Sequence, residues 1–293
     1  MIQVLSPTLW PDYELIDCGN FEKLERFGKY TVRRPEPQAL WSPSLLEREW
    51  EAKADATFSR SKSNPESGNW ALKTGMPEKW FGDLKRPDFK IKYKLSLSSF
   101  KHVGIFPEQA VNWDFLFEKL THLKKELPTP PKVLNLFAYT GMASVVSKAA
   151  GADVTHLDSI KQVVTWAREN MEASGLDGIR WMVEDALKFV QREVRRGNQY
   201  QCLILDPPAY GRGPDGEKWI LEEHLPKLLE ACTHILDPQH GIFVLNLYSL
   251  GFSTLITENL MKEYFPKKQA ELGEIYLEDS FKKKLPLGTF ARF

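Results

Sequence analysis

Residues 132–141, KVLNLFAYTG, and residues 200–208, YQCLILDPP, contain the stretches that decide the fold. Each holds a continuous apolar run and ends in residues that break a strand. A strand that is apolar at every position is buried on both faces, as in a parallel sheet covered by helices. These two stretches therefore predict neighbouring buried strands of one sheet.

Around them, strand and helix patterns alternate from about Pro107 onward. Further strands are predicted at DVTHLD (153–158), IRWMVE (179–184) and GIFVLNLY (241–248), and a terminal antiparallel pair at GEIYLE (273–278) and TFARF (289–293). Helices are predicted over 109–126, 141–150, 160–174, 186–196, 219–236 and 255–264. This order predicts an α/β fold with a doubly wound, mostly parallel sheet of seven strands.

The region before residue 100 has a different pattern of apolar and aromatic residues. Its apolar runs are short, and it carries five tryptophans, Trp10, Trp41, Trp50, Trp70 and Trp80. One helix is predicted near 45–56, and FSRSKSNPESGN (58–69) is expected to be a loop or hairpin tip. We therefore expect a small β-rich domain over 1–100, a candidate for substrate recognition, followed by the α/β domain over 101–293.

Composition excludes several classes of protein. The 293 residues are 42% hydrophobic, with 39 basic and 39 acidic side chains, as in an ordinary folded protein. We find neither an apolar run long enough for a membrane helix nor a secretory signal at the start. Cys18, Cys202 and Cys232 are widely spaced, which indicates reduced thiols rather than disulfides or a metal site. We expect a cytoplasmic protein without a membrane partner or a metal; the sequence does not define its oligomeric state.

A basic segment lies within the N-terminal region. From Lys85 to Lys101, the sequence KRPDFKIKYKLSLSSFK carries six basic residues against Asp88 alone. Lys90, Lys92 and Lys94 alternate with apolar residues, so on a strand they would form one basic row above an apolar underside. Such a row is typical of an RNA-facing surface or of a strand edge that lysines guard against pairing, and the sequence leaves both open.

Ligands of doubly wound sheets bind beyond the carboxyl ends of the strands. A dinucleotide would need several glycines at the first strand end, because its pyrophosphate approaches the backbone closely, and only Gly141 is present. A nucleoside with an amino acid tail and no phosphate has no such need. S-adenosyl-L-methionine is that ligand, and it is the expected cofactor.

Two acidic residues at strand ends suit this cofactor. Asp158 would accept hydrogen bonds from the ribose hydroxyls. Asp185 would receive the adenine amino group, while the backbone amide of Ala186 meets the ring. Taken singly, either aspartate is as typical of a helix cap.

The segment Asp206-Pro207-Pro208-Ala209-Tyr210 is the most specific feature. Two prolines remove two backbone donors and fix the backbone. The Asp206 carboxylate and the carbonyls after it would thus form a rigid group of acceptors. Such acceptors lower the cost of the positive charge that develops as a nitrogen attacks a methyl group. The ring of Tyr210 could stack on a base.

Four segments together resemble a known family. VLNLFAYTG (133–141), THLDSI (155–160), VEDAL (183–187) and LILDPPAYGRG (203–213) are similar in order and spacing to the class I S-adenosylmethionine-dependent methyltransferases. The likeness is strongest to the bacterial 23S ribosomal RNA large-subunit methyltransferases, which carry NLFxYTG and DPP motifs. The 101–293 region would then be the methyltransferase domain, with ribosomal RNA as its partner.

The resemblance also implies roles for single residues. The segment before the main domain would cover the cofactor, through Phe106 and Gln109. The methionine part would be surrounded by Asn135, Phe137, Thr140 and Gly141. The nucleoside would be held by Asp158, Ser159, Asp185 and Ala186. The methyl group would face Asp206 and Pro207, and the candidate catalytic residues are Asp206, Pro207, Pro208 and Tyr210.

The acceptor atom is less certain than the cofactor. Relatives that methylate carbon 5 of cytosine place a cysteine after the fifth strand, because that carbon needs a thiolate to activate the ring. Here Tyr248 and Ser249 stand in that stretch, so a base nitrogen in RNA is the expected acceptor. The alternatives are cytosine carbon 5, a protein or small-molecule acceptor, a silent cofactor-binding scaffold and, least favoured, a dehydrogenase.

Overall fold

The computed structural model describes residues 2–8, 10–61, 67–248 and 251–293. It divides into two compact units. Unit 1 consists of Met1–Leu5, Ala110–Ile275 and Gly288–Phe293, and unit 2 consists of Ser6–Gln109 and Tyr276–Leu287. These two units differ from the two domains expected on either side of residue 100, because the C-terminal segment Tyr276–Leu287 is grouped with the N-terminal residues.

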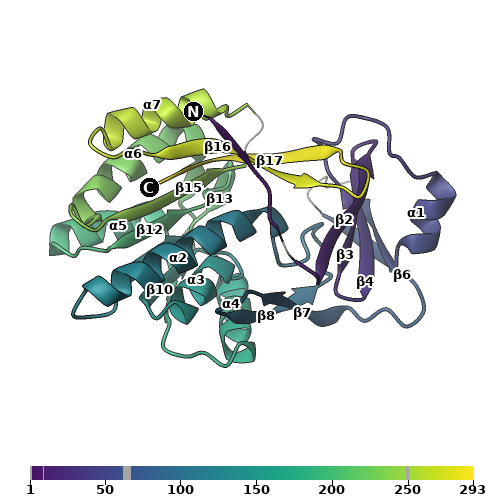
Figure 1. The fold of residues 1–293 in the computed structure, drawn as a ribbon, viewed down its shortest axis with the longest axis horizontal. Coiled ribbons are helices and arrows are strands. Elements are labelled where there is room, and N and C mark those ends of the chain that lie inside the picture. The colour runs from purple at the N-terminus through teal and green to yellow at the C-terminus, as the bar shows by residue number, and fades with distance from the viewer. Residues whose placement is uncertain (1, 9, 62–66, 249–250) are drawn as a thin grey trace. The chain divides into compact units, whose positions relative to one another are not determined.

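Unit 1 is built on one mostly parallel sheet (Figure 1). Its described strands are β1 (Gln3–Leu5), β9 (Lys132–Leu136), β10 (Asp153–Asp158), β11 (Arg180–Val183), β12 (Cys202–Leu205), β15 (Ile242–Leu247), β16 (Glu271–Glu278) and β17 (Lys284–Arg292). Their order is β1-β16-β17-β15-β12-β9-β10-β11, and β17 runs antiparallel to β15. Every residue of β12 and β15 is buried, which confirms the prediction of strands covered on both faces.

The predicted number of seven strands is wrong by one. The eighth described strand is β1, which pairs in parallel with β16, Gln3 lying beside Gly273. A strand of three residues has no periodicity that a sequence pattern can detect, and its pairing joins residues far apart in the chain.

Helices cover both faces of the sheet. They are α2 (Ala110–Glu126), α3 (Met142–Ala149), α4 (Lys161–Ala173), α5 (Ala186–Arg196), α6 (Leu221–Ile235) and α7 (Thr254–Tyr264). The first three adjoin one another, as do the last three, and the core between the sheet and α5–α7 is a continuous apolar cluster. None of the described helices is long and apolar enough to cross a membrane. The predicted doubly wound α/β architecture is confirmed.

The strand order sets the position of a ligand. From β9 the chain proceeds to β10 and β11 on one side, and then returns to β12 on the other side of β9. The order therefore reverses between β9 and β12. In open α/β sheets the crevice at this reversal, beyond the carboxyl ends of the strands, is where ligands bind.

Unit 2 is β-rich, as predicted. A five-stranded sheet contains β2 (Tyr13–Gly19), β3 (Glu22–Phe27), β4 (Tyr30–Pro35), β5 (Ala56–Arg60) and β6 (Gly68–Leu72), and a two-stranded sheet contains β7 (Lys79–Lys85) and β8 (Lys90–Ser96). Its helices are α1 (Glu47–Lys53) and a 3-10 turn at Pro107–Gln109. The helix predicted over 45–56 is shorter, since Ala56 begins β5.

The polar segment 58–69 was expected to be a loop or a hairpin tip, and it is part of a hairpin. Its first residues belong to β5 and its last to β6, and these strands pair antiparallel. Residues 62–66 between them lie outside the described part of the chain.

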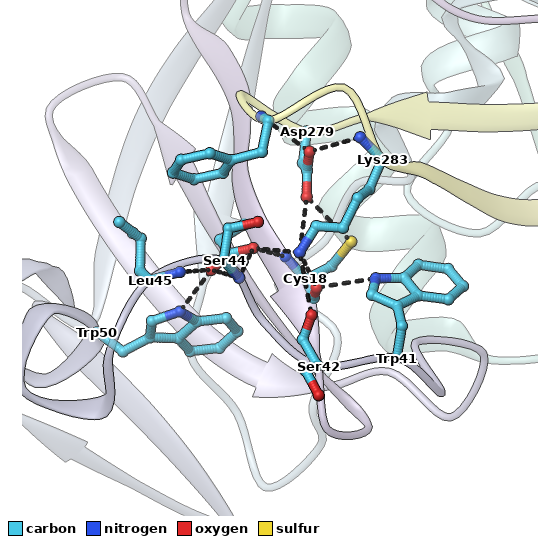
Figure 2. A network of polar contacts seen from close by, with 10 residues as sticks. Cys18, Trp41, Ser42, Ser44, Leu45, Trp50, Asp279 and Lys283 are labelled. Atoms are coloured by element: carbon cyan, nitrogen blue, oxygen red, sulfur yellow. Dashed lines mark hydrogen bonds and ion pairs between the residues drawn. The ribbon is translucent and has the colours of Figure 1, made fainter.

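A buried carboxylate gathers several parts of unit 2 around β2 (Figure 2). Asp17 accepts hydrogen bonds from Ser44 N (3.0 Å), Leu45 N (2.8 Å), Trp50 Nε1 (2.9 Å) and Lys283 Nζ (2.8 Å). Burial alone would raise the pKa of Asp17, but these donors, Lys283 foremost, hold it below its usual value. The carboxylate is therefore ionised, and it holds together the segment between β4 and α1, helix α1 and the C-terminal segment.

Lys283 has a second carboxylate beside it. Asp279 Oδ2 lies 3.4 Å from Lys283 Nζ and accepts a hydrogen bond from Cys18 Sγ at 3.5 Å. Burial, followed by the charge of Asp279, raises the pKa of Cys18 to about 12. Cys18 is therefore an un-ionised thiol within this network.

Candidate cofactor site and active site

The turn after β9 is as tight as its sequence suggests. Phe137, Tyr139 and Gly141 all have positive φ, at 55°, 49° and 80°. A Cβ atom on Gly141 would lie 2.7 Å from Cβ of Ala167, so only glycine fits there. Non-glycine residues in this conformation cost about 1 to 3 kcal/mol each, and such strain typically accompanies a functional constraint.

Asp158 lies at the end of β10, against this turn. Its Oδ2 accepts a hydrogen bond from Tyr139 N (2.9 Å) and its Oδ1 accepts one from Ile160 N (3.0 Å). Burial raises the pKa of Asp158, while these backbone donors lower it. Each oxygen keeps a second lone pair, so the carboxylate is held in position with acceptor capacity for two hydroxyls.

Asp185 has the cap role that the sequence offered as its alternative. It precedes α5, and its Oδ1 accepts a hydrogen bond from Lys188 N (2.9 Å). It also borders the same pocket as Asp158. Capping uses one oxygen of the carboxylate, so the cap does not prevent the other oxygen from meeting a ligand.

A pocket of about 320 Å³, including its open mouth, lies at these strand ends. It is lined by Phe137, Leu157, Asp158, Ser159, Glu184, Asp185, Ala186, Pro208, Gly211, Arg212, Gly213 and Trp219. Six of these were predicted from sequence, and the pocket brings them together from β9, β10, β11 and β12.

The other predicted cofactor residues lie elsewhere. Asn135 is buried behind the turn, where its Nδ2 donates to Ser144 Oγ (2.9 Å). The Thr140 carbonyl accepts a hydrogen bond from Asn170 Nδ2 (2.8 Å). These contacts shape the turn from its inner side. Phe106 and Gln109 belong to unit 2, and their place over the cofactor stays a prediction.

A hairpin that the sequence analysis missed forms one wall of the pocket. It consists of β13 (Tyr210–Arg212) and β14 (Lys218–Ile220). Trp219 Nε1 donates to the Pro208 carbonyl (2.7 Å), and the Trp219 ring lies 4.7 Å from that of Phe137. An ion pair between Lys188 and Glu217 connects the hairpin to α5. The signal for it was the turn sequence GPDGE at 213–217.

The prolines do not present every carbonyl after Asp206 as an acceptor, so that expectation is wrong in part. The Pro208 carbonyl is occupied by Trp219, and the Ala209 carbonyl accepts Leu221 N (3.0 Å). The Asp206 carboxylate is therefore the principal acceptor of this loop. Tyr210, on β13, is 75% exposed, so its ring is available for stacking.

Asp206 has a partner that the sequence did not reveal. Asn246, at the same level on the adjacent strand β15, donates from Nδ2 to Asp206 Oδ1 at 2.8 Å. Burial raises the pKa of Asp206 to about 6, and this hydrogen bond counteracts part of the effect. Among the described residues, Asn246 Oδ1 is a buried oxygen without a hydrogen-bond partner.

The three cysteines are buried. Cys202 is the first residue of β12 and Cys232 lies within α6, and burial raises the pKa of both thiols. Ser249, in the stretch where some relatives carry a cysteine, lies outside the described residues. Within the described ranges, no group of three or more His, Cys, Asp or Glu side chains could hold a metal ion.

A strand-order reversal with two acidic strand ends, one glycine turn and no phosphate loop defines an α/β protein that binds a nucleoside cofactor. A solved SAM-dependent methyltransferase from Agrobacterium tumefaciens is 39% identical to the chain, with a TM-score of 0.89 and coverage of 99% of this chain and 93% of that one. The chain therefore belongs to the SAM-dependent methyltransferases, and S-adenosylmethionine is its cofactor. No family model matches the sequence.

Curated relatives confirm the resemblance to the ribosomal RNA branch. Ribosomal RNA large subunit methyltransferase K/L of Shewanella frigidimarina is 27% identical over 163 residues, which is 54% of this chain and 22% of that protein. The protein of the same name from Shewanella amazonensis is 30% identical over 207 residues, 66% of this chain and 28% of that protein. The chain thus spans well under half the length of these relatives.

The ribose contact gives a direct test of the pocket. Asp158→Ala should weaken S-adenosylhomocysteine binding by about 1.5 to 3 kcal/mol, the range for hydrogen bonds to a charged group. Isothermal calorimetry measures this. Asp153→Ala, at the opposite end of β10 on an exposed position, is the matched control and should bind normally. Unchanged affinity in a folded Asp158 variant would contradict the assignment.

Proposed function

We propose that the chain transfers the methyl group of S-adenosylmethionine to a nitrogen atom of a base in RNA, in the cytoplasm. The observation that carries this proposal is Asp206, a partly buried carboxylate at the end of β12 with a pKa near 6. At neutral pH this carboxylate is mainly ionised, and the hydrogen bond from Asn246 favours the ionised form. The names of the curated relatives support RNA as the substrate.

The pocket residues bind and orient the cofactor. Asp158 holds the ribose, and the backbone at Ala186 with Asp185 holds the adenine. S-adenosylmethionine supplies a methyl group on a positively charged sulfur. Holding this methyl group in line with the acceptor nitrogen lowers the activation barrier, because the reacting atoms no longer have to find each other in the right orientation.

Asp206 then interacts with the acceptor base. It accepts a hydrogen bond from the N–H of the base and stabilises the positive charge that grows on the nitrogen as the N–C bond forms and the S–C bond breaks. The N–H proton passes to the Asp206 carboxylate, and S-adenosylhomocysteine is the leaving group. Tyr210, whose ring is exposed, stacks on the base plane. This assignment needs no thiolate, in keeping with buried cysteines whose pKa values are raised.

Mass spectrometry of nucleosides tests the proposal. RNA from cells with and without the gene should differ in one N-methylated nucleoside, and the purified protein should restore it in vitro. A difference in 5-methylcytidine instead would establish carbon methylation. No difference in RNA would shift the assignment to a protein or small-molecule acceptor, and no methyl transfer to any of these would leave a scaffold. Calorimetry with NAD would detect a dehydrogenase.

The role of Asn246 can be read from the pH dependence. Asn246→Leu removes a hydrogen bond that favours the ionised form, so the pKa of Asp206 should rise by roughly one unit or more. The rate falls as pH drops through this pKa, so the acidic limb of the kcat profile should move to higher pH.

The plateau at high pH separates this role from misfolding. At high pH both proteins carry an ionised Asp206, and the variant should recover most of the wild-type kcat. A variant whose kcat is lowered equally at every pH, or whose acidic limb stays in place, would show that Asn246 does not set the ionisation of Asp206.

A further inference from the structure

The two-stranded sheet of unit 2 has two chemically different faces. Along β7 and β8, residues alternate between buried and accessible positions, which confirms the predicted strand and its apolar underside. The underside carries Trp80, Leu84, Ile91, Tyr93 and Leu95, all buried. We call the opposite side the β7–β8 basic face; it consists of Lys79, Phe81, Asp83, Lys85, Lys90, Lys92 and Lys94.

The strand register places these side chains together. Phe81 lies opposite Lys94, Asp83 opposite Lys92, and Lys85 opposite Lys90. Five lysines thus share one small face with a single aspartate. The whole chain has equal numbers of basic and acidic residues, so this face is a local excess of positive charge and not a sample of the average surface.

Asp83 forms ion pairs with two of these lysines. Asp83 Oδ2 lies 3.2 Å from Lys90 Nζ and 3.5 Å from Lys85 Nζ. Both lysine side chains remain more than half exposed, and ion pairs at such exposure contribute little. Lys85 and Lys90 therefore remain accessible to an anion from solvent.

Phe81 distinguishes a binding surface from a guarded edge. Its side chain is 49% exposed in the middle of the lysines, and Lys92 Nζ lies 5.3 Å from the ring centroid. Lysines that guard a strand edge against aggregation have no use for an exposed aromatic ring, which favours association. Basic groups interleaved with an aromatic ring are the pattern of single-stranded nucleic-acid surfaces, where phosphates meet the cations and a base stacks on the ring.

We propose that the β7–β8 basic face binds a single-stranded segment of the RNA substrate, with its lysines on successive phosphates and Phe81 beneath a base. The inference rests on the proposed function in naming RNA. Lys90, Lys92 and Lys94 follow one another about 7 Å apart along the strand, a spacing of the same order as that of phosphates in an extended single strand. A duplex keeps its bases stacked inside and offers none to Phe81.

The first test is the salt dependence of binding. Anisotropy of a fluorescein-labelled single-stranded RNA should be measured between about 50 and 200 mM salt for the wild type and for Lys90→Ala/Lys92→Ala/Lys94→Ala. The slope of log affinity against log salt should fall by about 2, since each phosphate contact to a single strand contributes roughly 0.7. An unchanged slope would overturn the proposal.

A matched control removes the same charge elsewhere. Lys119→Ala/Lys124→Ala/Lys125→Ala takes three exposed lysines from α2 and changes the net charge equally. It should keep the wild-type slope. Equal losses in both triple variants would show that net charge alone acts, which contradicts a specific face.

The second test addresses the base. Phe81→Leu should weaken binding of the single strand about tenfold, the scale of one lost stacking contact, and leave the salt slope unchanged. A duplex of the same sequence should compete poorly. If the duplex competes equally, or if Phe81→Leu binds normally, then stacking of an unpaired base is refuted.

These measurements do not depend on methyl transfer. If the protein methylates no RNA but binds it through these lysines, the proposed function fails and the face stands. If RNA is methylated and the triple variant keeps both affinity and slope, the face fails and the function stands. Calorimetry with S-adenosylhomocysteine should give the same affinity for every variant in the face.

Discussion

Asp206→Ala should reduce turnover by about 100-fold or more and change S-adenosylhomocysteine affinity by less than about 1 kcal/mol. We propose that the carboxylate lies where positive charge develops during the transfer, and Asp206 is not among the residues that line the cofactor pocket. Its removal should therefore affect the transition state and spare the ground state. Single-turnover methylation of the RNA, with calorimetry of the cofactor, measures both quantities.

Cysteine variants test the competing chemistry. Cys18→Ala/Cys202→Ala/Cys232→Ala should retain most activity, after allowance for stability lost where the side chains are buried. An enzyme that methylates carbon 5 of cytosine cannot lose its attacking thiolate. Loss of activity in a folded triple variant, or an RNA adduct trapped with 5-fluorocytidine, would reverse the choice of acceptor atom.

Lys283→Met should lower the free energy of unfolding of unit 2 by about 3 to 5 kcal/mol, the cost of leaving buried charges without their partner. Lys283 Nζ lies 2.8 Å from Asp17 Oδ1 and 3.4 Å from Asp279 Oδ2, and both carboxylate side chains are fully buried. Methionine keeps the apolar stem of the side chain and removes only the charge. Urea unfolding followed by tryptophan fluorescence measures the change.

The neighbouring lysine is a close control. Lys282 also pairs with a carboxylate, Glu278, at 2.8 Å, but its side chain is 81% exposed. Lys282→Met should therefore change stability by less than about 1 kcal/mol. If the two substitutions lowered the free energy of unfolding equally, the larger cost that we assign to the buried ion pairs of Lys283 would be wrong.

The stability difference at Lys283 should also depend on pH with a defined sign. In the wild type the pKa of Asp17 is lowered, so its contribution is present above the unfolded pKa of about 3.9 and is lost as pH falls through the folded value. Without Lys283 this pKa rises. The gap between wild type and Lys283→Met should therefore be wide at neutral pH and narrow below about pH 4.

The sequence predicted the sheet because local patterns determine it. The strands β12 and β15 are buried on both faces, so they contain apolar runs, broken in β15 only by Asn246, that can be recognised without knowledge of their neighbours. The pocket residues Asp158 and Asp185 were predictable for the same reason, since the end of a strand is visible in the sequence and its place relative to the sheet follows from the fold class.

What escaped prediction depends on contacts between distant residues. Asn246 is recognised as a partner of Asp206 only when β15 and β12 lie in register. The hairpin β13–β14 has three residues in each strand, and the use of the Pro208 carbonyl by Trp219 follows from that hairpin. Short elements and side-chain pairs of this kind leave no periodic signal.

The network around Asp17 has a consequence for biosynthesis. Its lysine is encoded 266 residues after the carboxylate that it neutralises. At about 5 to 20 residues per second, a ribosome takes on the order of 15 to 50 s to cover that distance. During this interval the nascent N-terminal unit lacks both the residues from 276 to 287 and the cation that its buried carboxylate requires. Unit 2 therefore cannot complete its folding while only the N-terminal part of the chain has been synthesised. Its folding has to wait until residues 276–287 have left the ribosome.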